Sequence, residues 1–427
     1  MSTERAPKDQ DRLAVVDVMR GVAVVLMILW HTAQAWIATR FQTGAFWDTL
    51  RLLGGLAAPS FLFLAGMGVG LKAISDQRRG VPRAHTAIAL AARGAEIVFL
   101  GYVLRLQMWA IDSGGLFHSG LWRVATPAII GVALAVVGLR RLAKLDIASS
   151  IVGAGGIAWL VLALYQLSEI APRAIVGALR VDVLQAIGVA IAVVALLGSA
   201  INAFRRERIW ILVVAATILA LCVHRVALML PGSLPVPLAG YLAQWAVPVG
   251  APRPTLFPII PWVCYALVGS ATSVVWARSR HLGRTLFWYA ACGAMVAVAT
   301  SESWSWTFTV RLNAPDIIPL LRVVHRIGCV YVLFALALLL GRFSKPLHTL
   351  GQASLLVYWV HLEFAFGIAA WWARDERRGA LDPFQWFLGF VALTTAMWAM
   401  ALLRGSLRRG PIKKWMTCPL RKKSASL

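Results

Sequence analysis

The chain has 427 residues, of which 59% are hydrophobic and only 14% are charged, and its mean hydropathy is +0.73. Ordinary soluble domains are about one quarter charged. The composition therefore excludes a soluble globular protein and indicates a polytopic membrane protein. The formal net charge of +24 would also suit a nucleic-acid-binding protein, so the positions of the basic residues have to decide between the two classes.

Twelve stretches of the chain are apolar over roughly the 20 residues that a helix needs to cross a bilayer. Their length and helical patterning favour helices over barrel strands, and helices satisfy their own backbone hydrogen bonds inside hydrocarbon. The sequence therefore predicts an all-α transmembrane bundle of about twelve spans, with eleven as the alternative count. The stretches begin near Leu13, Leu50, His85, Val124, Leu145, Val181, Ile209, Leu256, Leu286, Ile317, Leu350 and Phe384.

Basic clusters precede the first span and then follow every second one, which is the positive-inside pattern of membrane proteins. They comprise Arg5/Lys8/Arg12, Lys72/Arg78/Arg79/Arg83, Arg140/Arg141/Lys144, Arg205/Arg206/Arg208, Arg278/Arg280/Arg284, Arg342/Lys345 and the tail from Arg408 to Lys423. This alternation indicates that the basic residues orient the protein in a lipid bilayer and do not bind nucleic acid. It predicts cytoplasmic tails at 1–12 and 406–427, a membrane domain at 13–405 in the cytoplasmic (inner) membrane, and an outer loop from Pro231 to Pro258.

The first span carries three polar residues on one face. Arg20 and His31 are eleven positions apart, almost three whole helical turns, and Asp17 precedes Arg20 by three. At 1.5 Å per residue, Arg20 and His31 lie about 16 Å apart along the axis, with the histidine nearer the outer side. Charged groups in a membrane helix usually face a protein interior or a wet cavity. The structural alternative is an i, i+3 ion pair of Asp17 with Arg20 and an interfacial role for His31.

Two later spans also carry histidines. "LLRVVHRIG" places His325 and Arg326 on one face in the outer half of its span, and "GQASLLVYWVHLEF" places Tyr358 and His361 on one stripe. Histidines from three helices are thus expected at similar depths. The alternatives are that Arg326 caps the outer end of its helix and that Tyr358 only anchors packing.

Other polar positions give weaker signals. Arg93 and Glu96 open the third span, where they form either an ion pair or part of an anion site; Asp182 begins the sixth span, and Trp262 suits an interfacial aromatic belt. Of the five cysteines, four fall in spans and Cys418 lies in the basic tail, so no disulfide framework is expected. No metal-ligand spacing is found, and no metal cofactor is expected.

Five segments together resemble a known family. "DVMRGVAVVLMILWH" looks like the first-helix motif of the membrane acyltransferase superfamily, in which ten residues separate the Arg of an Arg-Gly pair from a His. This motif is also seen in acyltransferase-3 proteins. "PSFLFLAGMGVGL", "DVLQAIGVAI", "FPIIPWVCYALVGS" and "LGQASLLVYWVHLEF" occur in the order of the heparan-α-glucosaminide N-acetyltransferase-like branch, bacterial members included. The resemblance extends from Arg12 to about Phe366.

The resemblance implies transfer of an acyl group, acetyl being the expected one, from cytoplasmic acetyl-CoA to a sugar or glycan on the outer side. Basic residues near the cytoplasmic face would hold the anionic CoA, with Arg20 and Arg93 as candidates beside Asp17. His31 would act as general base or as nucleophile.

The other candidate residues would assist His31. Either Arg326 or His325 would stabilise the oxyanion, and His361 would orient the acceptor. The candidates for contact with that acceptor are Tyr358, Trp262 and Asp182. A secondary transporter of an anionic solute is the alternative function, and a structural or regulatory membrane protein is a third that leaves the buried charges unexplained.

Overall fold

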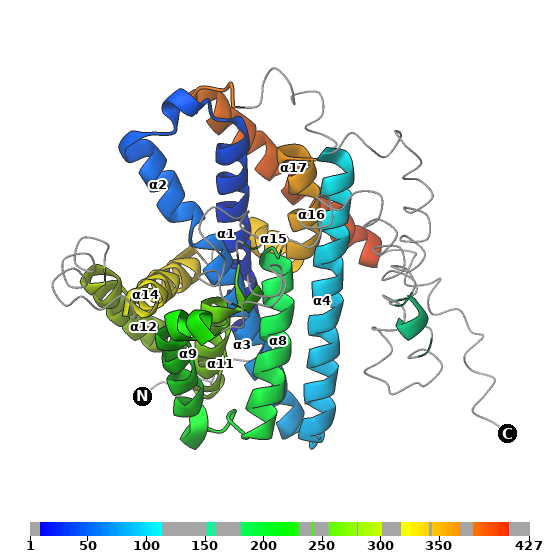
Figure 1. Cartoon of the computed structure of the whole chain (residues 1–427), viewed down its shortest axis with the longest axis vertical. Coiled ribbons are helices and arrows are strands. Elements are labelled where there is room, and N and C mark those ends of the chain that lie inside the picture. Colours follow the sequence, from blue (N-terminus) through cyan, green and yellow to red (C-terminus); the bar gives the residue numbers. More distant parts are fainter. Residues whose placement is uncertain are drawn as a thin grey trace, which may run out of the picture. The chain divides into compact units, whose positions relative to one another are not determined.

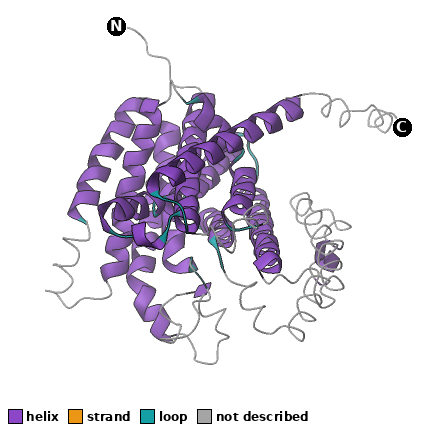
Figure 2. Ribbon diagram, turned by 90° about the horizontal axis from the view of Figure 1, so that it is seen from above, coloured by secondary structure: helices purple, strands orange, loops and turns teal. Residues whose placement is uncertain are grey.

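A computed structural model describes residues 9–112, 151, 153–156, 158, 181–229, 241–242, 255, 257–279, 281–300, 317–340, 344–367 and 379–409. In these ranges the chain is helical, and the extended pairings are isolated bridges between Ile37 and Leu381 and between Val181 and Thr255 (Figure 2). The predicted all-helical class is therefore confirmed for the described part of the chain.

Seven helical stretches among the described residues are long and apolar enough to cross a membrane. They are Ala14–Trp36, Gly44–Arg78, Arg83–Arg105, Val183–Ala200, Ile259–Arg278, Ile317–Ala337 and Pro383–Leu407. Each begins within a few residues of a stretch predicted from hydropathy, apart from Gly44–Arg78, which starts about two turns earlier. The predicted spans near Val124 and Leu145, and most of the loop from Pro231 to Pro258, lie outside the described residues.

The chain divides into two compact units. The first unit contains Met1–Arg12 and Ala58–Ala335, and the second contains Leu13–Ala57 and Leu336–Leu427. The first unit holds most of seven long helices, which Figure 1 labels: α3 (Ala57–Arg78), α4 (Arg83–Asp112), α8 (Val183–Ala200), α9 (Ile209–Met229), α11 (Ile259–Arg278), α12 (Leu282–Ala299) and α14 (Ile317–Leu339).

Helices of the first unit pack at small residues. The helices α4 and α8 run side by side (Figure 1), and a side chain added at Gly94 or at Gly188 would collide with the backbone of the other helix. At Gly66 of α3 an added Cβ would collide with the carbonyl of Ala266 in α11. Small residues let membrane helices approach closely enough for their backbones to touch. Gly66 therefore has a packing role, whereas a Cβ added at Gly68, two residues later, would meet no atom within 4 Å.

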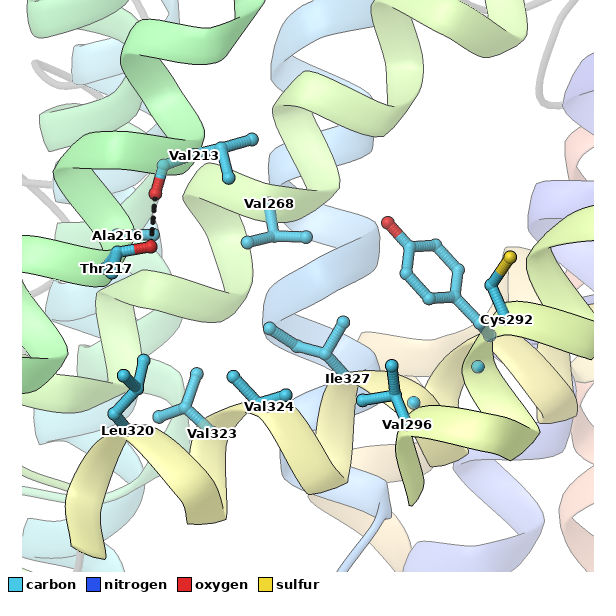
Figure 3. Close-up of a pocket in the computed structure, with 13 residues that line it drawn as sticks. Val213, Ala216, Thr217, Val268, Cys292, Val296, Leu320, Val323, Val324 and Ile327 are labelled. Carbon is cyan, nitrogen blue, oxygen red and sulfur yellow. Dashed lines mark hydrogen bonds between the residues drawn. The ribbon is translucent and has the colours of Figure 1, made fainter. Parts of the chain in front are cut away.

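The first unit also contains an apolar cavity of about 250 Å³ between α9, α11, α12 and α14 (Figure 3). Small and aliphatic residues, five of them valines, line most of it, and the hydroxyl and thiol groups come from Thr217, Cys292 and Tyr331. The Thr217 hydroxyl donates to the carbonyl of Val213 one turn earlier, at 3.0 Å. The cavity therefore offers hydrocarbon surface and no charged group.

The second unit holds most of α1 (Asp9–Trp36), the short 3-10 helix Thr39–Phe41, and the helices α2 (Gly44–Gly54), α15 (Lys345–Gln352), α16 (Ser354–Ala365) and α17 (Pro383–Arg409). Hence α1 begins at Asp9, four residues before the predicted start of the membrane domain at 13, and α17 continues to Arg409, four residues past its predicted end at 405. Both α15 and α16 contact α17.

Two predicted spans are interrupted helices. A turn at Gly55–Leu56 separates α2 from α3, and Ala353, with φ −102° and ψ 11°, separates α15 from α16. The 12 residues of α16 make a helix of about 18 Å, shorter than the roughly 30 Å hydrocarbon core of a bilayer. Among the described residues, the stretch predicted to begin near Leu350 therefore contains this short helix after a break at Ala353, and hydropathy does not register such a break.

Candidate functional site

Two histidines meet inside the second unit. The Nδ1 atom of His31 in α1 lies 2.8 Å from Nε2 of His361 in α16. The rings are only 7° from parallel and their centroids are 5.1 Å apart, so they lie edge to edge in one plane, as a hydrogen bond between ring nitrogens requires. The structure thus joins two of the three histidines that the sequence expected at similar depths.

His361 is buried completely, whereas His31 is partly accessible. The Nδ1 atom of His361 lies 2.8 Å from the carbonyl oxygen of Val357, one turn earlier in the same helix. The rings of Tyr358 and Phe366 lie edge-on to the pair, Tyr358 to His361 at 5.8 Å and Phe366 to His31 at 5.7 Å between centroids. Aromatic side chains therefore flank the imidazoles on both sides.

The C-terminal part of α1 is fixed by contacts with α17 and the residues before it. The indole nitrogen of Trp386 donates to the Thr32 hydroxyl at 3.1 Å, immediately beside His31. Backbone hydrogen bonds join Ala38 and Trp36 to Leu381, and Trp386 packs into a buried cluster with Ala33, Ile37 and Leu50. These contacts hold the backbone on which His31 is mounted.

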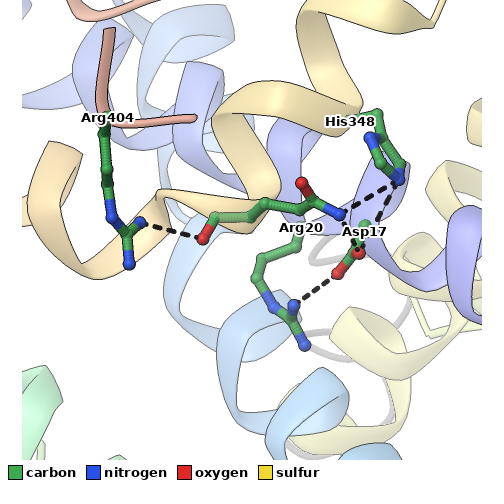
Figure 4. A network of polar contacts seen from close by, with 5 residues as sticks. Asp17, Arg20, His348 and Arg404 are labelled. Atoms are coloured by element: carbon green, nitrogen blue, oxygen red, sulfur yellow. Dashed lines mark hydrogen bonds and ion pairs between the residues drawn. The ribbon is translucent and has the colours of Figure 1, made fainter. Parts of the chain in front are cut away.

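Near the other end of α1 a polar network surrounds Asp17 (Figure 4). Arg20 donates from Nη1 to the Asp17 carboxylate at 2.6 Å, so the i, i+3 ion pair considered from the sequence is formed. His348 and Gln352 of α15 approach the other carboxylate oxygen, with Nε2 atoms 3.8 and 3.4 Å away. Arg404 of α17 donates to the backbone carbonyl of Gln352 at 3.1 Å.

The backbones of α1 and α15 touch at two glycines beside this network. A Cβ added at Gly351 would collide with the carbonyl of Asp17, and one added at Gly21 would collide with the carbonyl of Leu347. The Arg-Gly pair of the first-helix motif therefore has two distinct tasks. Arg20 supplies a cation whose side chain is 30% exposed, and Gly21 lets the neighbouring helix approach.

The histidine of α14 has a different environment, which belongs to the first unit. Its Nδ1 atom lies 2.9 Å from the carbonyl oxygen of Ala297 in α12, and its Nε2 atom lies 3.8 Å from Sγ of Cys329, one turn along its own helix. Because a carbonyl only accepts, Nδ1 of His325 carries the hydrogen and Nε2 accepts from the thiol. Both ring nitrogens therefore have partners within the helix pair, which favours a packing role.

Arg326 lies against an aromatic surface of α11. Its guanidinium carbon is 5.6 Å from the Trp262 ring centroid, and its side chain is hydrogen-bonded to the Tyr265 hydroxyl. Trp262 also packs against Phe257 and Tyr265, at 4.8 and 5.6 Å between centroids. Cation–π contact and a phenol hydrogen bond together hold the guanidinium in place.

Arg93 and Asp182 form local structure within the first unit. Arg93 pairs with Glu96 at 2.5 Å, as the ion-pair alternative has it. Asp182 is the N-cap of α8: its carboxylate accepts from the Val183 backbone in a capping box with Gln185, and Arg105 lies 4.0 Å away. The spacing Asp-x-x-Gln in "DVLQ" predicts such a cap and could have identified this role. Among the described residues no group of three or more His, Cys, Asp or Glu side chains could hold a metal ion.

Sequence reasoning missed His348, Gln352 and Arg404. His348 and Gln352 are spaced i, i+4 and so share one helical face, a signal present in "KPLHTLGQ". Their contact with Asp17 joins segments more than 330 positions apart, which no local pattern predicts.

The model of one protein family matches this chain. The family is described as heparan-α-glucosaminide N-acetyltransferase, catalytic, and its model matches residues 12–303. No curated protein matches the chain. The matched range includes Arg20 and His31 and ends before α14, α15, α16 and α17, so His361 and His348 come from a part of the chain that the match does not cover.

Proposed function

This chain belongs to the heparan-α-glucosaminide N-acetyltransferase catalytic family, and we propose that it transfers an acetyl group from cytoplasmic acetyl-CoA to a carbohydrate on the outer side of the membrane. The family implies acetyltransferase activity, and the seven apolar helices fit a multi-pass membrane protein. Beyond this activity, the proposal specifies the CoA donor, the glycan acceptor, the cytoplasmic membrane, and the side of the membrane from which each substrate enters.

The observation that carries the proposal is the pair formed by His31 and His361. An imidazole on a membrane-spanning helix, hydrogen-bonded to a second imidazole and partly accessible, suits proton transfer better than packing, because a polar group in a membrane helix costs free energy unless it is used or satisfied. As general base, His31 takes the proton of the acceptor hydroxyl or amine while the acceptor atom attacks the thioester carbonyl. The C–S bond then breaks, and His31 returns the proton to the CoA sulfur.

The donor is assigned to the region around Arg20. CoA carries phosphate groups, and a guanidinium binds phosphate through paired hydrogen bonds. The Arg20 side chain is 30% exposed and lies about three helical turns, roughly 16 Å, from His31 along α1. An extended pantetheine arm covers a distance of this order, so one helix presents both the phosphate contact and the reacting base.

The remaining candidates receive secondary roles. Tyr358 stays the candidate for acceptor contact, because its ring lies beside His361. Arg326 is held against Trp262 within the first unit, and its oxyanion role stays a prediction from the sequence. The contacts of Arg93 and Asp182 within their own unit explain both residues structurally.

The proposal is tested with purified protein in sealed vesicles, using acetyl-CoA as donor and glucosamine as acceptor. With inside-out vesicles, radiolabelled acetyl-CoA in the bath is expected to acetylate glucosamine trapped in the lumen. Right-side-out vesicles should give no labelling from the same bath, because the donor site faces the lumen. This expectation follows from the positive-inside orientation.

Two outcomes would contradict the proposal. Equal labelling in both preparations, with vesicle integrity confirmed, would refute the sidedness. Uptake of glucosamine or of an anionic solute without any release of free CoA would refute the enzyme and support the transporter alternative. Comparing envelope glycans by mass spectrometry in cells with and without the gene then identifies the acceptor from the mass of one missing acetyl group.

A further inference from the structure

We propose that His361 is a positioning residue that holds His31 in a single tautomer, with the hydrogen on Nδ1 and the lone pair on Nε2. The inference rests on the proposed function, in which His31 acts on the acceptor, and it assigns to His361 a task other than contact with the acceptor. The hydrogen-bonded chain from the Val357 carbonyl through His361 to His31 carries it.

The chain of hydrogen bonds begins at a group that only accepts. The carbonyl oxygen of Val357 lies 2.8 Å from Nδ1 of His361, so this nitrogen must carry a hydrogen. A neutral imidazole has one N–H, which leaves Nε2 of His361 as an acceptor. Burial of His361 opposes a second proton on the ring, because the charged form loses its hydration there.

The second step fixes His31. Its Nδ1 atom lies 2.8 Å from Nε2 of His361, and two ring nitrogens at that distance need one hydrogen between them. Since His361 offers the lone pair, Nδ1 of His31 carries the hydrogen and Nε2 of His31 carries the lone pair. Free histidine in water favours the opposite tautomer, so His361 selects the less common form and the basic nitrogen becomes the one farther from α1.

This arrangement has a chemical consequence during transfer. When Nε2 of His31 takes the acceptor proton, the ring becomes an imidazolium, and its bond from Nδ1 to His361 becomes charge-assisted and stronger. The proton cannot move on through His361, because Nδ1 of that ring already donates to the Val357 carbonyl and a carbonyl takes no proton. It therefore stays on His31 until it is delivered to the CoA sulfur as the C–S bond breaks.

The part of the chain that the structure describes contains no hydrogen-bond partner for Nε2 of His31, whereas both nitrogens of His361 are engaged. A pair built only for packing would leave no reason for this asymmetry. The positioning role also explains why the fully buried ring is the one on the short helix α16 and the partly accessible ring is the one on α1.

Two substitutions test the hydrogen bonds of the two His361 nitrogens separately. The amide of a glutamine reaches about as far as Nε2, so His361→Gln places an acceptor oxygen near Nδ1 of His31. The shorter amide of an asparagine reaches about as far as Nδ1, so His361→Asn keeps a donor toward Val357 and removes the acceptor. The two variants are matched in chemistry and differ in which hydrogen bond survives.

We expect His361→Asn to lower kcat for acetyl transfer to glucosamine by about 100-fold, within the range that a positioned acid–base group contributes. For His361→Gln we expect a fall of about 10-fold. In both variants KM for acetyl-CoA should stay within about threefold of the native protein, because the donor contacts lie elsewhere. Equal loss in the two variants, or a raised KM with unchanged kcat, would overturn the positioning role.

A spectroscopic measurement needs no activity. In protein labelled with ¹⁵N-histidine, the signals lost in His31→Gln identify His31, and its two nitrogen shifts report which one carries the hydrogen. We expect Nδ1–H in the native protein, and a shift toward Nε2–H in His361→Asn. A native His31 with its hydrogen on Nε2 would overturn the inference even if neither His361 variant folds. Native protein that shows the expected tautomer but transfers no acetyl group would refute the proposed function and leave the tautomer assignment standing.

Discussion

His31 in α1 and His325 in α14 lie in different units of the chain, and each is the histidine of a helix long and apolar enough to span a membrane. Both rings carry their hydrogen on Nδ1, but the partners differ. His31 donates to the ring of His361, whereas His325 donates to the backbone carbonyl of Ala297 and accepts at Nε2 from the Cys329 thiol. The same side chain thus belongs to a hydrogen-bonded pair of imidazoles in one unit and to a helix contact in the other.

Arg20 of the second unit and Arg326 of the first also differ in their partners. Arg20 pairs with the partly exposed Asp17 in a network that two further residues of α15 approach. Arg326 lies against the faces of Trp262 and is bonded to Tyr265. A partly exposed cation with a competing carboxylate can exchange its partner for a phosphate, whereas a cation packed on aromatic rings is fixed in place. We therefore propose that the second unit contains the binding and reacting site.

The comparison is tested most strongly by His31→Ala. Without the base, transfer should fall by about 1,000-fold or more, in the range that a positioned general base contributes. Acetyl-CoA binding should persist, because Arg20 is unchanged. The measurement is CoA release from acetyl-CoA with glucosamine as acceptor, together with the elution profile of the purified protein to verify its fold.

Gln34→Ala is the matched control for this variant. Gln34 is exposed, lies one turn beyond His31 in α1, and is assigned no part in the reaction. A His31→Ala protein that turns over at the rate of this control would remove His31 from the chemistry and with it the distinction between the two units.

A smaller effect is expected for Arg20→Ala. Loss of a hydrogen bond to a charged group costs about 1.5–3 kcal/mol, and the partial exposure of Arg20 favours the lower end, so we expect KM for acetyl-CoA to rise about tenfold with kcat nearly unchanged. Arg20→Lys should recover part of this loss, since it keeps the charge and loses the paired geometry. Asp17→Asn should lower KM, because it removes the carboxylate that competes with the donor phosphate.

Arg51→Ala is the control for the arginine series. Arg51 also pairs with an aspartate three residues earlier, Asp48, at 3.1 Å, but on the exposed surface of α2. Its removal should leave KM for acetyl-CoA unchanged. A normal KM in Arg20→Ala, or a raised KM in Asp17→Asn, would show that the Asp17–Arg20 pair is structural and that the donor binds elsewhere.

Much of α1 could be predicted from the sequence. Its apolar length gives the span, and helical spacing places Asp17, Arg20 and His31 on one face. From the sequence, a contact between His31 and His361 was only one of several possible contacts between histidines. Hydropathy orders the spans along the chain but does not identify which helices are neighbours. The choice of His361 over His325 as the partner is therefore information that only the structure supplies.

The interruptions of helices were harder to predict for a related reason. Hydropathy averages over a window, so the turn at Gly55 and the change of direction at Ala353 are invisible in an apolar stretch. The same holds for the role of Gly21, which needs the position of Leu347 in α15 to be understood. Side-chain chemistry within one helix was predictable, whereas contacts between helices were not.

The smallest effect is expected for His325→Ala, the counterpart of the first substitution in the other unit. Its ring nitrogens are hydrogen-bonded to the carbonyl of Ala297 and the thiol of Cys329. Removal of the His325 ring should therefore leave kcat within about threefold of the native value. Stability should fall, because a hydrogen bond in a helix pair contributes about 1 kcal/mol and truncation also removes packing. Thermal unfolding in detergent and CoA release, measured on one preparation, separate the two effects. If His325→Ala loses transfer as completely as His31→Ala while its melting temperature is unchanged, then the ring acts in the reaction, the oxyanion role expected for the His325/Arg326 pair is supported, and hydrogen-bond saturation does not distinguish a packing histidine from a reacting one in this protein.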